Sequence, residues 1–120
     1  MNYDIIFNQP FAREVKRLNK KYHSLKSDLC LLEQELLSNP NAGVDLGNGV
    51  HKVRMAIGSK GRGKSHGARV ITVLITLDED NAEINLLYIY DKADRDTISP
   101  AEIENLLKAA GLKLSDTGKL

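Results

Sequence analysis

The sequence predicts an α+β fold, with helices packed on a mostly antiparallel β-sheet of about four strands. Apolar residues recur at helical spacing in three segments, residues 51–57 alternate with the period of two typical of strands, and residues 69–77 are rich in Val, Ile and Thr. The segments follow the order strand, two helices, three strands joined by hairpins and a last helix, without the strand–helix alternation of a parallel sheet. A length of 120 residues predicts one domain, which we place at residues 1–112.

A strand and a helical hairpin are predicted for the first third of the chain. Residues 3–7 are a short apolar stretch of the kind that forms a strand. The spacing of apolar residues predicts one helix over 11–22, with a basic outer face, and a second helix over 25–36. The second helix ends at residues 39–43, which contain Asn, Pro and Gly. Because the connection between the helices is short, the prediction is an antiparallel hairpin.

Three strands are predicted for the middle of the chain. The first covers residues 51–57 and is followed by a glycine-rich basic loop at 58–67. The second covers residues 69–77 and ends at an acidic turn, residues 78–81. The third strand, residues 84–90, is apolar on both faces, which predicts a central position in the sheet.

The last predicted helix has clear signals at both ends. Ser99 and Glu102 have the spacing of a capping box, and Pro100 stands at the first helical position. Gly111 stands where a C-terminal cap belongs. We expect the remaining residues, 113–120, to form a flexible tail.

The composition favours a protein of a reducing compartment, and we expect the cytoplasm. The single cysteine, Cys30, excludes an intramolecular disulfide framework. Its place in a leucine-rich helix predicts a small buried apolar residue. The longest unbroken run of apolar residues and threonine, residues 70–77, is too short to cross a bilayer, and the N-terminus does not have the pattern of a signal peptide.

Positive charge is concentrated in one window of the sequence. The formal net charge is only +1, yet residues 46–77 contain no Asp or Glu, and ten of the sixteen acidic residues lie from Asp78 onward. Glycines separate the cations in the loop of this window, so that backbone and cations can approach a phosphate closely. An ordinary solvated surface is the alternative interpretation. We predict a polyanion-binding face carried by the six cations of the window, which are Lys52, Arg54, Lys60, Arg62, Lys64 and Arg69.

Residues 58–65 also fit the Walker A pattern G-x-x-x-x-G-K-[ST] at every fixed position. Binding of a nucleotide triphosphate by this motif requires an α-helix that begins at the Lys-Ser pair. Here Ser65 is followed by His66-Gly67 and a β-branched run, and only 13 residues separate Lys64 from Asp78. The context therefore argues against a nucleotide triphosphatase.

Three segments together resemble a known family. They are the Lys-x-Arg strand at 52–54, the basic loop at 61–69 and the strand at 86–92, which ends in Tyr-x-Lys. They are similar to the K-x-R strand, the G-K-S-G-G-A-R-V-I-like loop and the L-L-x-x-Y-x-K strand of the RelE/HigB branch of the RelE/ParE toxin superfamily. The resemblance covers residues 11–110 in the same order of elements. His66 stands where many relatives have glycine.

The resemblance implies a RelE-like fold and a toxin of a type II toxin–antitoxin system. Such toxins are ribosome-dependent mRNA interferases that a cognate antitoxin, of helix-turn-helix or RelB-like type, neutralises. They cut mRNA through attack of its own 2′-OH on the adjacent phosphodiester, without a metal or another cofactor. The reaction needs a base, cations for the charge on the phosphorane and an acid for the leaving oxygen. Neighbouring cations lower the pKa of a lysine, so a cluster of Lys and Arg can meet all three needs.

The candidate catalytic residues are Arg54, Lys64, Arg69 and Tyr90. We expect Arg54 and Arg69 to hold the scissile phosphate and Lys64 to transfer a proton. Tyr90 is predicted to stack on an unpaired base, with a half-buried core tyrosine whose hydroxyl is hydrogen-bonded as the alternative. Further contacts with RNA and its phosphates are expected from Lys52, Lys60, Arg62, Lys92 and His66. For His66, an acid–base role stands beside that of a merely solvated loop residue.

The basic outer face of the first helix is predicted to contact ribosomal RNA. The residues concerned are Arg13, Lys16, Arg17 and Lys20. Ordinary helix-surface charge is the alternative. No Asp, Glu and His cluster has the spacing of metal ligands, which agrees with metal-free chemistry.

Two alternatives of other classes remain open at this point. One is a non-catalytic protein of the same fold that poisons a topoisomerase or only binds its antitoxin. The other is a plain RNA-binding module, which would bind RNA with a dependence on salt but would not cut it.

Overall fold

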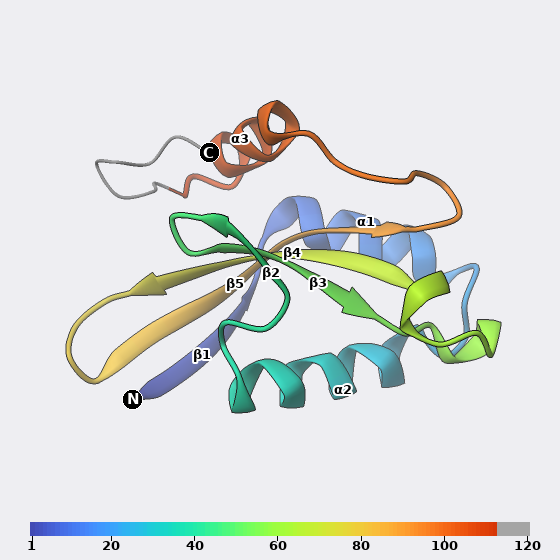
Figure 1. The fold of residues 1–120 in the computed structure, drawn as a ribbon, viewed down its shortest axis with the longest axis horizontal. Coiled ribbons are helices and arrows are strands. Elements are labelled where there is room, and N and C mark those ends of the chain that lie inside the picture. The colour runs from blue at the N-terminus through green and yellow to red at the C-terminus, as the bar shows by residue number, and fades with distance from the viewer. Residues whose placement is uncertain (113–120) are drawn as a thin grey trace.

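The computed structural model describes residues 1–112, and the predicted tail at residues 113–120 lies outside them. One five-stranded sheet has the strand order β1-β5-β4-β3-β2, and α2 and α3 lie on opposite sides of it (Figure 1). In chain order the strands and helices are β1 (Asn2–Phe7), α1 (Gln9–Asn19), α2 (Leu25–Ser38), β2 (Val44–Gly47), β3 (Val50–Met55), β4 (Ala68–Thr76), β5 (Asn81–Asp91) and α3 (Pro100–Ala109).

The sheet is mostly antiparallel, as predicted. β1 pairs in parallel with β5, and every other neighbouring pair is antiparallel. β5 lies between β1 and β4 and is buried on both faces over most of its length, in agreement with its apolar sequence. The prediction of an α+β fold with a mostly antiparallel sheet is confirmed.

Two apolar clusters cover the two faces of the sheet. On one face α1 and α2 pack on β3, β4 and β5, with Phe11, Leu18, Leu25 and Leu36 fully buried. On the other face α3 packs on the sheet through Ile103 and other apolar residues. The loop between β3 and β4 is left at one end of the sheet, away from the middle of both clusters (Figure 1).

The strand β2 differs from the prediction of about four strands. It is only four residues long and includes Asp45 and Gly47, so it lacks the alternation of the longer strands. It reaches β3 through a tight turn in which Asn48 and Gly49 have φ angles of 56° and 82°. The Asn-Gly pair is a typical signal for such a hairpin. The Asn48-Gly49 dipeptide is therefore the sequence signal for this hairpin.

Two other features of the N-terminal half differ from expectation. α1 begins at Gln9 and ends at Asn19, so that Tyr22 lies beyond its end and is nevertheless buried. Cys30 is exposed rather than buried, because it lies on the part of α2 that faces an open groove beside α1. Within residues 1–112, no helix combines the length and the apolar character needed to cross a membrane.

The glycine-rich loop contains two short 3₁₀ turns, η1 (Gly58–Lys60) and η2 (Lys64–His66), and no α-helix. β4 begins at Ala68, directly after this loop. A Walker A motif needs an α-helix N-terminus at its Lys-Ser pair to hold the phosphates. The loop at residues 58–67 does not contain that helix, which argues against a nucleotide triphosphatase.

Replacement of Ser99 by alanine is expected to lower the free energy of unfolding by about 1 kcal/mol. The Ser99 side chain accepts a hydrogen bond from the backbone N–H of Glu102, and the Glu102 carboxylate accepts one from the backbone N–H of Ser99. Urea unfolding would measure the loss. Ser27→Ala, at an exposed position within α2, is the control and should change stability by less than about 0.5 kcal/mol. Equal effects of the two substitutions would contradict the prediction.

Candidate functional site

Three of the predicted catalytic residues form a row across three strands. In the register of the sheet, Arg54 of β3 lies opposite Arg69 of β4, which lies opposite Tyr90 of β5. Directly opposed residues of neighbouring antiparallel strands share one face of the sheet, with Cβ atoms about 4.5–5.5 Å apart. Tyr90 belongs to the α3-side cluster, so we place the row on that face. Lys52 lies two residues before Arg54 on β3 and therefore shares this face.

The two arginines of the row form an electrostatically unfavourable pair. Arg54 is exposed, and within residues 1–112 its side chain has no hydrogen bond or ion pair. Like charges directly opposite each other destabilise a sheet. An anion bound between Arg54 and Arg69 would relieve this repulsion.

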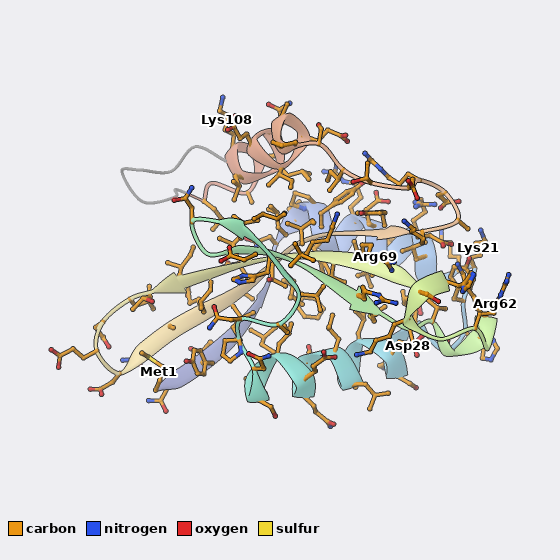
Figure 2. All side chains as sticks on the ribbon, viewed as in Figure 1. Met1, Lys21, Asp28, Arg62, Arg69 and Lys108 are labelled. Atoms are coloured by element: carbon orange, nitrogen blue, oxygen red, sulfur yellow. The ribbon has the colours of Figure 1, made fainter. Side chains whose placement is uncertain are left out.

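Arg69 also connects the sheet to the loop. Its Nη1 donates hydrogen bonds to the backbone oxygens of Lys64 at 3.0 Å and Ala68 at 3.1 Å. Figure 2 shows Arg69 on the sheet, inward from Arg62 of the loop. Arg69 thus holds η2 against the row in addition to contributing its charge.

Lys64 lies apart from the row in this conformation. Its Nζ is 3.4 Å from Oε2 of Glu35 on α2, and the residue lines a small pocket with Asp28 and other residues of α2. Both partners of the Lys64–Glu35 pair are substantially exposed, and exposed pairs of this kind contribute about 0–1 kcal/mol. The ammonium can therefore leave Glu35 at low cost.

Four of the five predicted RNA contacts line one pocket. This pocket, of about 370 Å³, lies between the loop and the residues that follow β5. Its lining residues are Lys60, Arg62, His66, Lys92 and Ala93. Lys52, the fifth predicted contact, lies on the sheet face instead. The four side chains come together because the loop folds back against the end of β5, where the backbone N–H of Lys92 donates to the oxygen of Gly67 at 3.0 Å.

Two cations of this pocket are paired within the chain. Lys60 Nζ is 2.6 Å from Oδ1 of the fully buried Asp91, and Lys92 Nζ is 2.7 Å from Oδ1 of Asp96. Arg62 is exposed, and within residues 1–112 its side chain has no such partner. The His66 ring nitrogen Nδ1 lies 3.0 Å from the hydroxyl of Ser65. Arg62 is therefore the pocket cation most available to an external phosphate.

Tyr90 is a core residue with only 2% of its surface exposed. The guanidinium carbon of Arg95 lies 5.5 Å from the centre of its ring. Burial raises the pKa of the Tyr90 phenol, while the charges of Arg69 and Arg95 oppose the rise. The buried hydroxyl has no hydrogen-bond partner among the described residues, unlike the hydrogen-bonded core tyrosine considered as the alternative. A base can stack on this ring only after Arg95 has moved.

Two acidic residues of the site were not predicted from the sequence. Asp96 pairs with Lys92, and its pKa lies below the usual value because of the Lys92 hydrogen bond and charge and the further positive charges of Lys52 and Arg69. Asp91 is buried beneath the loop. The spacing of four residues between Lys92 and Asp96 is a sequence signal for their ion pair. No such signal exists for Asp91, because its partners Lys60 and Tyr22 are distant in sequence.

The predicted ribosomal contacts on α1 lie on the surface. Arg13, Lys16, Arg17 and Lys20 are all exposed. Arg17 is partly engaged, at 3.0 Å from Glu14 and 3.6 Å from Asp94. Lys21, just beyond α1, lies at the same end of the molecule as Arg62 (Figure 2). Lys21 and the loop residue Lys60 both contact Asp91, so the end of α1 lies beside the loop.

Among residues 1–112, no group of three or more His, Cys, Asp or Glu is placed to hold a metal ion.

Comparison with known families gives a match over nearly the whole chain. Residues 6–119 match the family described as "RelE toxin of RelE / RelB toxin-antitoxin system". No curated protein matches the sequence. The family match covers nearly the whole chain and includes every candidate residue named above.

Proposed function

We propose that this chain, which belongs to the RelE toxin family of toxin–antitoxin systems, cuts mRNA on the ribosome as a metal-free endoribonuclease. The single observation that carries the proposal is the cross-strand pair of Arg54 and Arg69. Two opposed guanidiniums on rigid strands are costly for the fold and well suited to a phosphate whose negative charge increases during reaction.

The proposed reaction uses the 2′-OH of the mRNA as its nucleophile. The 2′ oxygen bonds to the adjacent phosphorus and loses its proton to a base, while the bond from phosphorus to the 5′ oxygen breaks and that oxygen receives a proton. The products are a 2′,3′-cyclic phosphate and a 5′-OH end. Arg54 and Arg69 stabilise the phosphorane, on which the negative charge is greatest.

Lys64 is proposed for proton transfer. It lies on η2, whose backbone Arg69 holds against the row, and its exposed pair with Glu35 is weak. His66, on the same turn, is the second candidate acid or base. Arg62, Lys52 and Lys92 are proposed to contact the flanking phosphates. Tyr90 forms the β5 end of the row and becomes available for base stacking only if Arg95 moves.

A toxin of such a system has an antitoxin partner. We propose a helix-turn-helix or RelB-like antitoxin with acidic groups that cover the basic loop. The α1 residues Arg13, Lys16, Arg17 and Lys20 are proposed to contact ribosomal RNA. The protein is proposed to act in the cytoplasm, where its ribosomal substrate is found.

A defined mRNA on translating ribosomes provides the test of this function. We expect cuts within the ribosome-bound mRNA when the purified chain is added, and none in the same mRNA free in solution. A protein that binds RNA or only its antitoxin would leave the mRNA intact in both cases, and a topoisomerase poison would instead stabilise DNA breaks.

Replacement of Arg62 by glutamine is expected to weaken RNA binding and its dependence on salt. Each lost phosphate contact reduces the slope of log K against log salt by about 0.7 for a single strand. Titration of a labelled single-stranded RNA between about 50 and 200 mM salt measures the slope. Lys26→Gln, an exposed cation of α2 that lines the groove beside α1, is the matched control and should leave the slope unchanged. If Arg62→Gln and Lys26→Gln give equal slopes, Arg62 makes no phosphate contact.

A further inference from the structure

A buried carboxylate lies where β5, the segment after α1 and the basic loop meet. The side chain of Asp91 is 0% exposed. It accepts hydrogen bonds from Lys60 Nζ at 2.6 Å, from the backbone N–H of Ala93 at 2.9 Å and from the hydroxyl of Tyr22. Lys21 Nζ lies 3.8 Å from its second oxygen. Asp91 thus has partners from three separate segments of the chain.

These partners keep Asp91 ionised in the interior. Burial opposes ionisation, but the hydrogen bonds from Lys60, Tyr22 and the Ala93 amide outweigh it and hold the pKa of the Asp91 carboxyl below its usual value. A carboxylate this deeply buried is tolerated only when it is paired and hydrogen-bonded. The side chain of Lys60 is itself only 15% exposed, and its ammonium lies 5.4 Å from the centre of the Tyr22 ring. The Lys60–Asp91 pair is therefore an internal contact rather than a loose surface pair.

Lys60 also connects the two halves of the loop. It belongs to η1, and its Nζ donates a second hydrogen bond to the backbone oxygen of His66 in η2 at 2.8 Å. A single ammonium thus joins η1, η2 and the end of β5. On the side of α2, the start of the loop is held separately, because the Asp28 carboxylate accepts from the backbone N–H of Gly58 at 3.1 Å and the Ser24 hydroxyl accepts from that of Ser59 at 2.8 Å.

We infer that Asp91 is a positioning residue, which acts through Lys60 to fix the loop at residues 58–67 against the Arg54–Arg69 pair. This inference rests on the proposed nuclease function, because it gives the loop a fixed place relative to the reacting phosphate. It also changes the role of Lys60. The sequence predicts that Lys60 binds phosphate, whereas an ammonium with Asp91 and His66 as partners holds the loop and leaves phosphate binding to Arg62 and its neighbours.

The inference is tested with Asp91→Asn, Lys60→Gln and the double variant, in the full chain and with ribosomes. Because a small displacement of catalytic groups greatly slows a reaction, we expect Asp91→Asn to lower kcat by about tenfold or more and to leave the salt slope of RNA binding unchanged. Lys60→Gln leaves the charge of Asp91 buried without the ammonium of Lys60. Because Asp91→Asn removes that charge, the double variant should be at least as active as Lys60→Gln alone. Asp80→Asn, in the turn at the opposite end of β5, removes the same charge and should retain wild-type kcat.

A direct phosphate contact of Lys60 would give different results. Lys60→Gln would then lower the salt slope as Arg62→Gln does. The kcat of the double variant would fall by the product of the factors by which the two single variants lower it. Either result would overturn the inference. If Asp91→Asn does not fold, Tyr22→Phe removes one hydrogen bond from the carboxylate and should also lower kcat without changing the salt slope.

Amide hydrogen exchange separates this inference from the proposed function. We expect exchange at residues 58–67 to become at least about tenfold faster in Asp91→Asn than in the wild type or Asp80→Asn, since the loop loses the attachment that Lys60 makes to the end of β5. A wild-type chain that cuts no mRNA would contradict the nuclease but would not change this expectation. Unchanged exchange in the loop of Asp91→Asn would overturn the positioning role even if the chain cuts mRNA.

Discussion

The Arg54→Gln variant is expected to cut ribosome-bound mRNA about 100- to 1000-fold more slowly than the wild type. Removal of one preorganised donor to a transition-state charge typically costs this much in kcat. Arg54 is the clearest residue for this test, because its exposed side chain has no hydrogen bond or ion pair within residues 1–112. A slower reaction would therefore reflect the lost charge and not a damaged fold.

Single-turnover cleavage on programmed ribosomes measures this effect. If Arg54 acts mainly in the transition state, kcat and kcat/KM should fall together. Lys108→Gln removes the same charge from an exposed position on α3, far from the loop (Figure 2), and should change the rate by less than about threefold. An Arg54→Gln protein with the wild-type rate would exclude the cation pair as the catalytic site.

Replacement of Gly67 by alanine is expected to lower the free energy of unfolding by about 3 kcal/mol, the upper part of the usual range for an overpacked site. A Cβ atom at this position would lie 2.0 Å from the backbone oxygen of Met55 and 3.0 Å from Cα of Ala56. Both atoms belong to the backbone at the end of β3, so no side-chain rotation relieves the clash. The substitution would also disturb the hydrogen bond between the Gly67 oxygen and the Lys92 amide.

Urea unfolding measures this loss as a shift in the midpoint. Gly61→Ala is the matched control, because Gly61 has a φ of 65° but no neighbouring atom within 4 Å of the new Cβ. Its expected cost is the conformational strain alone, about 1–2 kcal/mol. Equal stabilities of Gly67→Ala and Gly61→Ala would mean that the loop moves freely away from β3.

The two glycines illustrate what the sequence reveals about the loop. The alternation of glycine with cations predicts a backbone that approaches phosphate closely. In the structure Gly67 has a different role, since it lets the loop pack directly on the backbone of β3. The sequence shows that position 67 has no side chain. Which neighbouring atom occupies the place of a Cβ there depends on tertiary packing.

Element order and fold class follow well from apolar spacing, because long amphipathic segments leave few other arrangements. Apolar spacing does not indicate β2, because a four-residue strand that includes Asp45 and Gly47 is too short to show an alternating pattern. The same spacing extends the first predicted helix to residue 22, because the buried Tyr22 continues the helical pattern after α1 has ended at Asn19.

The candidate site is only partly predictable in the same way. The concentration of cations at residues 46–77 is plain in the sequence, but the pairing of Arg54 with Arg69 depends on the register across an irregular loop. The Asp91 contacts join residues 31 and 69 positions apart, Lys60 and Tyr22. Such pairings follow from the packing of loop, helix and sheet, and residue type alone does not indicate them.

The chemistry of the cut ends tests the central claim most directly. Ribosome-bound mRNA cut by the wild-type chain should carry 2′,3′-cyclic phosphate and 5′-OH ends, because the 2′ oxygen of the mRNA is the attacking group. Ends with a 3′-OH and a 5′-phosphate would show that water attacks instead, and would contradict a site built from Arg54, Arg69 and the lysines of the loop.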